Sequence, residues 1–154
     1  MGEGASGVIS KAIWQQENGT TKEVAVKVFK GTVTSDGYPE DEMDACILAG
    51  NHPNLVTVLG KINQHQLQQQ GLVLALIPPT FHNLGLPPSF DTCTRDVFLP
   101  GTAFSIRQVV AIALAIASAA AHLHKRGIMH GDLYAHNTLV NAHHINSLHQ
   151  SRQK

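Results

Sequence analysis

The sequence predicts an α+β fold, in which an antiparallel sheet with one short helix is followed by a long apolar helix. Three observations support this prediction. Runs rich in β-branched residues dominate residues 8–77, residues 78–103 are rich in Pro, Gly, Asn and Ser, and residues 105–124 are helix-compatible throughout. Residues 78–103 are the expected boundary between two lobes. Residues 142–154 form a polar tail.

The first two predicted strands form a hairpin. Val8 to Trp14 and Glu23 to Phe29 are separated by a polar stretch with Asn18-Gly19, which is a strong signal for a tight turn. Two more strands are predicted in "NLVTVLGKI" and "GLVLALI", because both are apolar and β-branched and a Gln-rich stretch separates them. The sheet should therefore contain at least four strands.

A short helix is predicted in "PEDEMDACILAG", between the second and third strands. Pro39 suits the first helical turn, acidic residues follow it there, and Gly50 is a stop signal. Met43 and Ile47 are four residues apart, so they predict the apolar face of this helix.

A long helix is predicted in "SIRQVVAIALAIASAAAHLHKRG". Ser105 suits the N-cap, and Gly127 follows Lys125 and Arg126 as a stop. The middle of this helix is apolar nearly all round, so we expect it to be covered on several faces. The apolar run Val109 to Ala121 is shorter than the roughly 20 residues that a spanning helix needs, so no membrane span is expected.

The composition excludes several classes of function. Lys plus Arg (11) balance Asp plus Glu (11), so no overall field would attract nucleic acid or an anionic membrane. Cys46 and Cys93 form no metal-type pair and the opening does not read as a signal peptide, so a reducing, cytoplasmic location is expected. His143, His144 and His149 have no Cys or acidic neighbours in the polar tail, so no metal site is predicted there.

Two motifs in the first lobe suit nucleotide phosphates. "GEGASGVI" fits G-x-G-x-x-G-x-V with Gly2, Gly4 and Gly7, and with Ile9 in the place of Val; such glycines let backbone amides approach phosphate oxygens. The pattern alone is also typical of an ordinary turn. Lys27, in "VAVK", lies in an apolar run where its ammonium is costly to bury without an anion. The alternative is a lysine that reaches solvent from a sheet edge.

Two further motifs follow along the chain. "HPNLV" (residues 52–56) joins the short helix to the third strand, and "HGDLYAHN" supplies Asp132 and Asn137. A carboxylate can accept a proton from a hydroxyl group, and an amide oxygen can ligate magnesium.

In this order, the four motifs resemble the protein kinase family over residues 2–141. The resemblance implies a two-lobed protein-kinase-like fold with ATP between the lobes. It implies an N-lobe of antiparallel sheet and one helix over residues 1–77, a hinge and linker over 78–103, and a truncated helical C-lobe over 104–141. It further implies ATP and Mg²⁺ as cofactors, and a protein substrate whose Ser/Thr or Tyr hydroxyl receives the γ-phosphoryl group.

Carried over by position, the resemblance assigns the site residues. Lys27 would pair with the α and β phosphates, Asp132 would be the catalytic base, and Asn137 would ligate the metal. The helix carboxylate that would hold the lysine stays open between Glu40 and Asp44, which share one helix face. The residues that would cover the phosphates or contact adenine are Gly2, Gly4, Gly7, Ile9 and Ala25, with the hinge backbone from Leu74 through Leu76 to Ile77.

The chain also departs from the family pattern. Gly131 replaces the Arg of H-R-D, so no side chain is there to bind a phosphorylated activation loop. Tyr134 and His136 match neither the usual Ser/Thr-kinase nor the usual Tyr-kinase loop, so the acceptor residue stays open. His-Gly-Asp is also used by aminoglycoside and choline phosphotransferases, which makes a small-molecule kinase the rival interpretation.

The largest departure is the absence of acidic residues after the catalytic loop. From Leu133 to Lys154 there is no Asp and no Glu, whereas the family uses a second metal-binding Asp in D-F-G. Phosphoryl transfer should therefore be severely impaired, and we interpret the chain as part of a kinase domain from a fragmentary gene model, with Met1 directly before the glycine motif. A non-catalytic kinase-like binding module is the other alternative. The long helix would lack its usual partners and expose a surface that self-associates.

Overall fold

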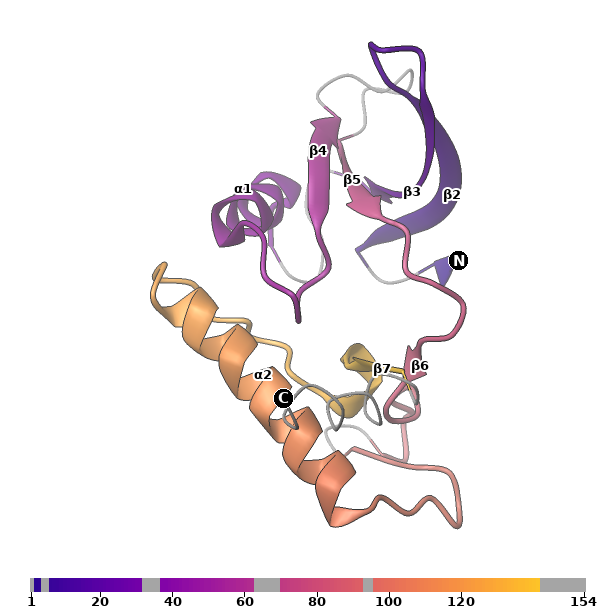
Figure 1. Ribbon diagram of the computed structural model, residues 1–154, viewed down its shortest axis with the longest axis vertical. Coiled ribbons are helices and arrows are strands. Elements are labelled where there is room, and N and C mark those ends of the chain that lie inside the picture. The colour runs from indigo at the N-terminus through magenta and orange to yellow at the C-terminus, as the bar shows by residue number, and fades with distance from the viewer. Residues whose placement is uncertain (1, 4–5, 32–36, 63–69, 93–95, 142–154) are drawn as a thin grey trace, which may run out of the picture. The chain divides into compact units, whose positions relative to one another are not determined.

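The computed structural model describes residues 2–3, 6–31, 37–62, 70–92 and 96–141 of the chain (Figure 1). The chain divides into two compact units, which we call unit 1 (Met1–Ile77) and unit 2 (Pro78–Lys154). Their boundary coincides with the expected end of the first lobe. The polar tail, residues 142–154, lies outside the described residues.

Unit 1 is built on a five-stranded antiparallel sheet with the order β1-β2-β3-β5-β4. The hairpin of β2 and β3 turns at Gly19, which has a φ of 80°, a value that favours glycine. The predictions of an antiparallel sheet, of the hairpin and of at least four strands are confirmed. The strands are β1 (Gly2–Glu3), β2 (Gly7–Gln15), β3 (Thr21–Phe29), β4 (Val58–Ile62) and β5 (Gly71–Ala75).

Helix α1 (Pro39–Ala49) begins and ends where the sequence predicts. Gly50 follows it with a φ of 63° and donates its N–H to the carbonyl oxygen of Ile47 at 3.1 Å. Acidic residues occupy the first turn, where the helix dipole favours negative charge. "HPNLV" then forms a turn, in which Leu55 donates its N–H to the carbonyl oxygen of His52, before β4 begins.

The core of unit 1 lies between α1 and the sheet. Phe29 of β3, Met43 of α1 and Leu72 of β5 form a fully buried cluster. The prediction that Ile47 shares the buried face with Met43 is wrong, because Ile47 is 48% exposed. Successive residues of an α-helix are rotated by about 100° around its axis. The face toward the sheet runs through Pro39, Met43, Cys46 and Ala49, which leaves Ile47 outside this stripe.

Unit 2 contains one long helix, α2 (Ile106–His124). Ser105 and Gln108 form a capping box, in which each side chain accepts a hydrogen bond from the backbone N–H of the other residue. At the other end, Ile128 donates its N–H to the carbonyl oxygen of Leu123 at 3.1 Å, and Gly127, with a φ of 71°, donates to His124 at 3.0 Å. This is a Schellman motif. The predicted N-cap at Ser105 and the predicted stop at Gly127 are both confirmed.

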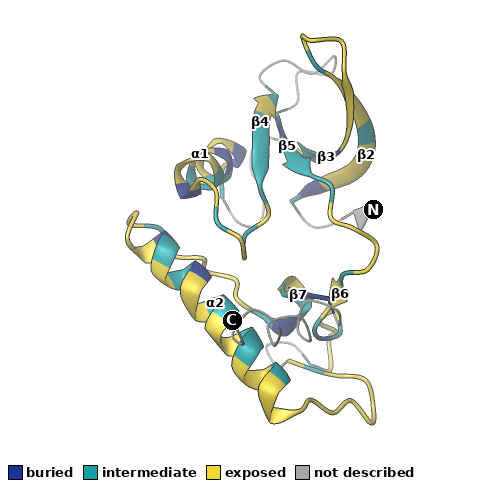
Figure 2. Cartoon of the chain, viewed as in Figure 1, coloured by how far each residue is buried: buried dark blue, intermediate teal, exposed yellow. Residues whose placement is uncertain are grey.

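Helix α2 is mostly exposed within the described residues (Figure 2). Only Ala119 and Leu123 of this helix are buried, whereas Ile106, Val110 and Leu114 are exposed. By length and composition α2 could cross a membrane, a test that core helices of soluble proteins also pass. The expected cover on several faces is not present among the described residues. The predicted self-association through this surface stays a prediction.

The stretch predicted as a plain linker is more ordered than expected. Strand β6 (His82–Asn83) pairs with β7 (Leu139–Val140), and a single bridge joins Leu86 to Val97. Between α2 and β7 the chain forms a short 3-10 helix, η1 (Ala135–Asn137). The linker therefore packs against the segment that carries "HGDLYAHN".

Candidate active site

One face of the unit 1 sheet gathers four of the predicted nucleotide-binding residues. Lys27 lies directly opposite Ile9 of β2, and Ala25 lies directly opposite Leu74 of β5. Residues two apart on a strand and residues in register across an antiparallel pair share a face. Ile9, Ala25, Lys27 and Leu74 therefore lie on the same face of the sheet as the buried Phe29.

Lys27 forms an ion pair with Glu42 of α1. The side chains are only 16% and 30% exposed, so water screens the pair weakly. The Lys27 ammonium also lies 4.6 Å from the centre of the Phe29 ring, a cation–π contact that fixes it further. A lysine held by a helix carboxylate over an apolar face is not one that reaches solvent from a sheet edge. This arrangement favours the interpretation of Lys27 as a phosphate-binding residue.

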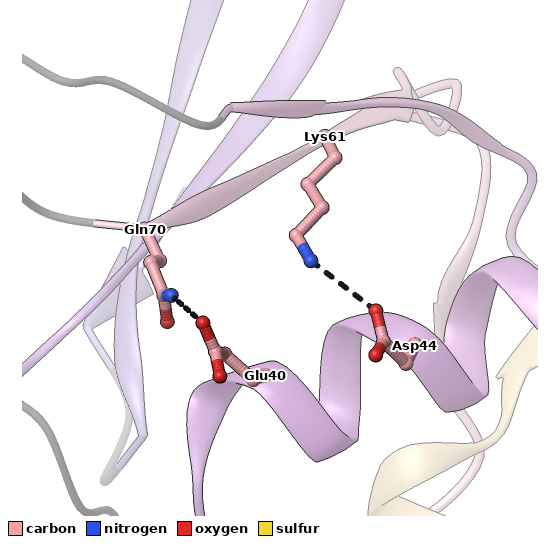
Figure 3. Close-up of polar contacts among 4 residues, drawn as sticks. All are labelled: Glu40, Asp44, Lys61 and Gln70. Carbon is pink, nitrogen blue, oxygen red and sulfur yellow. Dashed lines mark hydrogen bonds and ion pairs between the residues drawn. The ribbon is translucent and has the colours of Figure 1, made fainter.

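Glu40 and Asp44, the two carboxylates considered for this role, have other partners (Figure 3). Glu40 accepts a hydrogen bond from the Gln70 side chain at 2.7 Å, and Asp44 pairs with Lys61 at 3.2 Å. The assignment of either residue to Lys27 is wrong. Glu42 is two residues from each of them, about 200° around the helix, and lies beside the buried Met43. Glu40 and Asp44 share the other side of α1, where Asp44 meets Lys61 of β4 and Glu40 meets Gln70, directly before β5.

Cys46 lies one turn after Glu42 and packs against the buried cluster. Burial raises the pKa of its thiol, the nearby Glu42 carboxylate raises it further, and the Lys27 ammonium lowers it. The thiolate is therefore a minor species at neutral pH. Cys46 is a packing residue beside the ion pair and not a reactive cysteine.

The glycine motif is partly described. Gly2 lies in β1, opposite Ile9, whereas Gly4 lies outside the described residues. Gly7 is buried at the start of β2, where an added Cβ would lie 2.5 Å from the carbonyl oxygen of Val28. Glycine is therefore required at position 7 by strand packing alone, independently of any phosphate.

Replacing Gly7 with alanine is expected to destabilise unit 1 by about 1–3 kcal/mol, because the new methyl group forces β2 and β3 apart. Gly60→Ala in β4 is the matched control, since a Cβ there meets nothing within 4 Å. Urea unfolding followed by the fluorescence of Trp14, the single tryptophan, measures both variants. Equal midpoints for the two variants would contradict the steric argument.

The predicted hinge begins inside a strand. Leu74 belongs to β5 and packs against the buried cluster, and Ala75 donates its N–H to the carbonyl oxygen of Thr57 at 2.9 Å. Leu76 and Ile77 follow the end of β5. Of the four predicted hinge residues, the last two are therefore the better candidates for backbone contacts with a base.

Asp132 and Asn137 are brought together in unit 2. The Asn137 side-chain amide donates to the Asp132 carboxylate at 2.6 Å and to the Asp132 carbonyl oxygen at 3.2 Å. This leaves the Asn137 amide oxygen as the atom that can ligate a cation. Gly131, before Asp132, has a φ of 77°, which an arginine could adopt only with strain.

The remaining side chains of the loop are also placed. The rings of Tyr134 and His136 stack at a centroid separation of 5.4 Å and an interplanar angle of 18°. Their presence at these positions is what separates the loop from the two usual kinase patterns. Among the described residues, no three His, Cys, Asp or Glu side chains gather as a metal site.

Comparison with known proteins decides the family. The family model for protein tyrosine and serine/threonine kinases matches residues 1–148. The chain belongs to this kinase family. It is 34% identical, over 91% of its length, to the probable serine/threonine-protein kinase gdt4 of Dictyostelium discoideum. It is also 28% identical over 92% to the tyrosine-protein kinase receptor TYRO3 of Danio rerio, and 27% identical over 91% to the tyrosine-protein kinase Mer of Mus musculus.

The family match confirms the two-lobed α+β kinase fold and the protein-kinase branch, and it disfavours the small-molecule phosphotransferase. The match also runs through α2, which favours a helix of the kinase domain over a membrane span. This kinase chain covers 7%, 16% and 14% of the lengths of gdt4, TYRO3 and Mer, respectively. The activities of those whole proteins therefore do not transfer directly to it.

Three residues that hold the loop between Asp132 and Asn137 were not found from the sequence. Asp96 accepts a hydrogen bond from the Ala135 N–H at 2.8 Å, Gly85 donates its N–H to the Ala135 carbonyl oxygen at 3.1 Å, and the Asn83 side chain donates to the His136 carbonyl oxygen. All three lie in the predicted linker. A Pro- and Gly-rich stretch carries no periodic signal from which these long-range contacts could be predicted.

Proposed function

We propose that this chain is an ATP-binding protein kinase domain that directs the γ-phosphoryl group of ATP to a protein hydroxyl. Lys27, held by Glu42, would bind the α and β phosphates. Asp132 would accept the hydroxyl proton and Asn137 would ligate Mg²⁺. The observation that carries the proposal is the Lys27–Glu42 ion pair, because a lysine on the third strand paired with a helix glutamate is the arrangement that protein kinases use for phosphates.

The nucleotide would lie against the shared face of β2, β3 and β5. Ile9, Ala25 and Leu74 supply apolar surface for adenine there, with Leu76 and the hinge backbone beside it. Gly2, Gly4 and Gly7 precede this face in the chain and would cover the phosphates. The family supports ATP and a protein substrate as partners, and a cytoplasmic site of action is expected for the domain.

The residues present fit magnesium only in part. Asp132 and Asn137 offer one carboxylate and one amide oxygen, and magnesium prefers oxygen ligands completed by phosphates and water. The D-F-G aspartate that the family adds is not in the sequence from Leu133 to Lys154. Magnesium would neutralise phosphate charge during transfer, and the residues of this chain would hold it with few anionic groups. We therefore expect this chain to bind nucleotide but to transfer its phosphoryl group only slowly.

The test separates binding from transfer. Titration calorimetry of the 154-residue chain with ATP and Mg²⁺ should give binding that Lys27→Met weakens by about tenfold or more, the equivalent of about 1.4 kcal/mol for one lost charged contact. Lys61→Met removes an equal charge from the neighbouring Asp44 pair and should leave the affinity unchanged. An equal loss of ATP affinity in both variants, or no ATP binding at all, would contradict the proposed nucleotide site.

Transfer is measured with labelled ATP and a mixed peptide substrate. We expect little transfer from this chain, because the second metal ligand is missing. Robust transfer that Asp132→Asn abolishes would show that the metal argument is wrong while supporting the assigned base. Tight binding that needs no magnesium, without turnover, would favour the non-catalytic kinase-like binding module, whose support is the absence of acidic residues after Leu133.

A further inference from the structure

Residues of the linker (78–103) hold the loop between Asp132 and Asn137 at its midpoint, Ala135. Ala135, three residues after the aspartate, is only 7% exposed. Its N–H donates to the Asp96 carboxylate at 2.8 Å, and its carbonyl oxygen accepts from the Gly85 N–H at 3.1 Å. Both backbone groups of this buried residue are therefore bound by a segment about 40 to 50 positions earlier in the sequence.

The linker that supplies these contacts is itself fixed. Leu86 donates its N–H to the Val97 carbonyl oxygen at 2.7 Å, which joins the residue that follows Gly85 to the residue that follows Asp96. Leu84 donates to the Thr138 carbonyl oxygen at 2.8 Å, where β6 joins β7. Asp96 is thus anchored through the backbone on one side while its carboxylate reaches the loop on the other.

Close approach at this point depends on glycine. A Cβ at Gly85 would lie 2.7 Å from the Ala135 Cβ and 3.1 Å from the Val97 carbonyl oxygen. Any larger residue would push the linker and the loop apart. Gly85 permits the close approach and the Asp96 carboxylate makes a hydrogen bond across it. The two together indicate a specific packing contact between the linker and the loop.

We propose that Asp96 is a positioning residue for the catalytic loop, which it holds through the Ala135 N–H so that Asp132 and Asn137 stay hydrogen-bonded. This inference rests on the proposed function for the roles of Asp132 and Asn137. Asp96 touches neither of them, and its charge-assisted hydrogen bond to the intervening turn sets the distance between them. Without it, the Ala135 N–H loses its acceptor and the turn can move toward solvent.

Nuclear magnetic resonance of the ¹⁵N-labelled chain without nucleotide tests this directly. The side-chain amide protons of Asn137, assigned by their loss in Asn137→Ser, report the bond to Asp132. In Asp96→Ala they should shift to the position of exposed asparagine amides, while the resonances of Ala119 and Leu123 in α2 stay in place. In Asp96→Asn they should keep their position, because the amide oxygen can still accept from Ala135.

Asp91→Ala is the matched control, since it removes a carboxylate from the same linker, and it should leave the Asn137 signals unchanged. Unmoved Asn137 signals in Asp96→Ala would overturn the proposal. So would loss of the whole fold in both Asp96 variants, which would assign the residue a general structural role. Nucleotide takes no part in the measurement, so a failure of the proposed function in the calorimetric test would remain distinguishable from a failure of this inference.

Discussion

Truncation of Met43 to alanine is expected to lower the free energy of unfolding of this chain by about 2–5 kcal/mol, the range for removing a long buried side chain from a packed core. Met43 has no exposed surface and sits between Phe29 and Leu72, so a cavity forms between α1 and the sheet. The same helix carries Glu42, and its loosening should also weaken the hold on Lys27. Urea unfolding followed by Trp14 fluorescence measures the loss.

Ile47→Ala is the control, because it removes a similar apolar volume one turn later from a residue that is 48% exposed. We expect a cost of about 0.5–1 kcal/mol there. A cost for Ile47 equal to that for Met43 would show that both form the buried face, as the spacing alone suggests. The comparison therefore tests the packing of α1 and not only the size of a side chain.

The helix limits of α1 were predictable and its orientation was not. Pro39 and Gly50 act locally, through a fixed φ at the start and a positive φ at the end, so the sequence alone places the boundaries. The buried face is chosen by the sheet, and "PEDEMDACILAG" has too few apolar residues to mark one stripe. Glu42 was missed for this reason, because a glutamate beside a buried face looks like any exposed acidic residue until its lysine is placed opposite.

The same distinction separates the two halves of the candidate site. Lys27, Asp132 and Asn137 are recognisable because their chemistry depends on short, ordered motifs. Asp96 and Gly85 act on the loop across a long sequence separation, and no motif connects them to it. Local signals predict which residues carry chemistry, whereas tertiary contacts decide which residues hold them in place.

The Lys27–Glu42 pair should show a large coupling energy in a double-mutant cycle. Breaking a buried ion pair typically costs about 3–5 kcal/mol, and partial exposure of these side chains reduces the expected value to about 1–3 kcal/mol. Lys27→Met should be costly, because it removes the only partner that the described residues give the Glu42 carboxylate, whose second oxygen is buried without a hydrogen bond. It also removes the contact with the Phe29 ring. Unfolding in urea of Lys27→Met, Glu42→Gln and the double variant measures the coupling.

The pair of Lys61 and Asp44 on the same helix is the matched reference. Asp44 is 71% exposed, so the cycle of Lys61→Met and Asp44→Asn should give about 0–1 kcal/mol and should weaken further in salt. A coupling for Lys27 and Glu42 no larger than this would mean that the pair is held by solvent-exposed attraction alone. In that case Glu42 would not fix the lysine, and the strongest structural support for a phosphate site in unit 1 would be lost. A large, salt-resistant coupling confined to the inner pair would instead show that α1 is the element that keeps Lys27 in place.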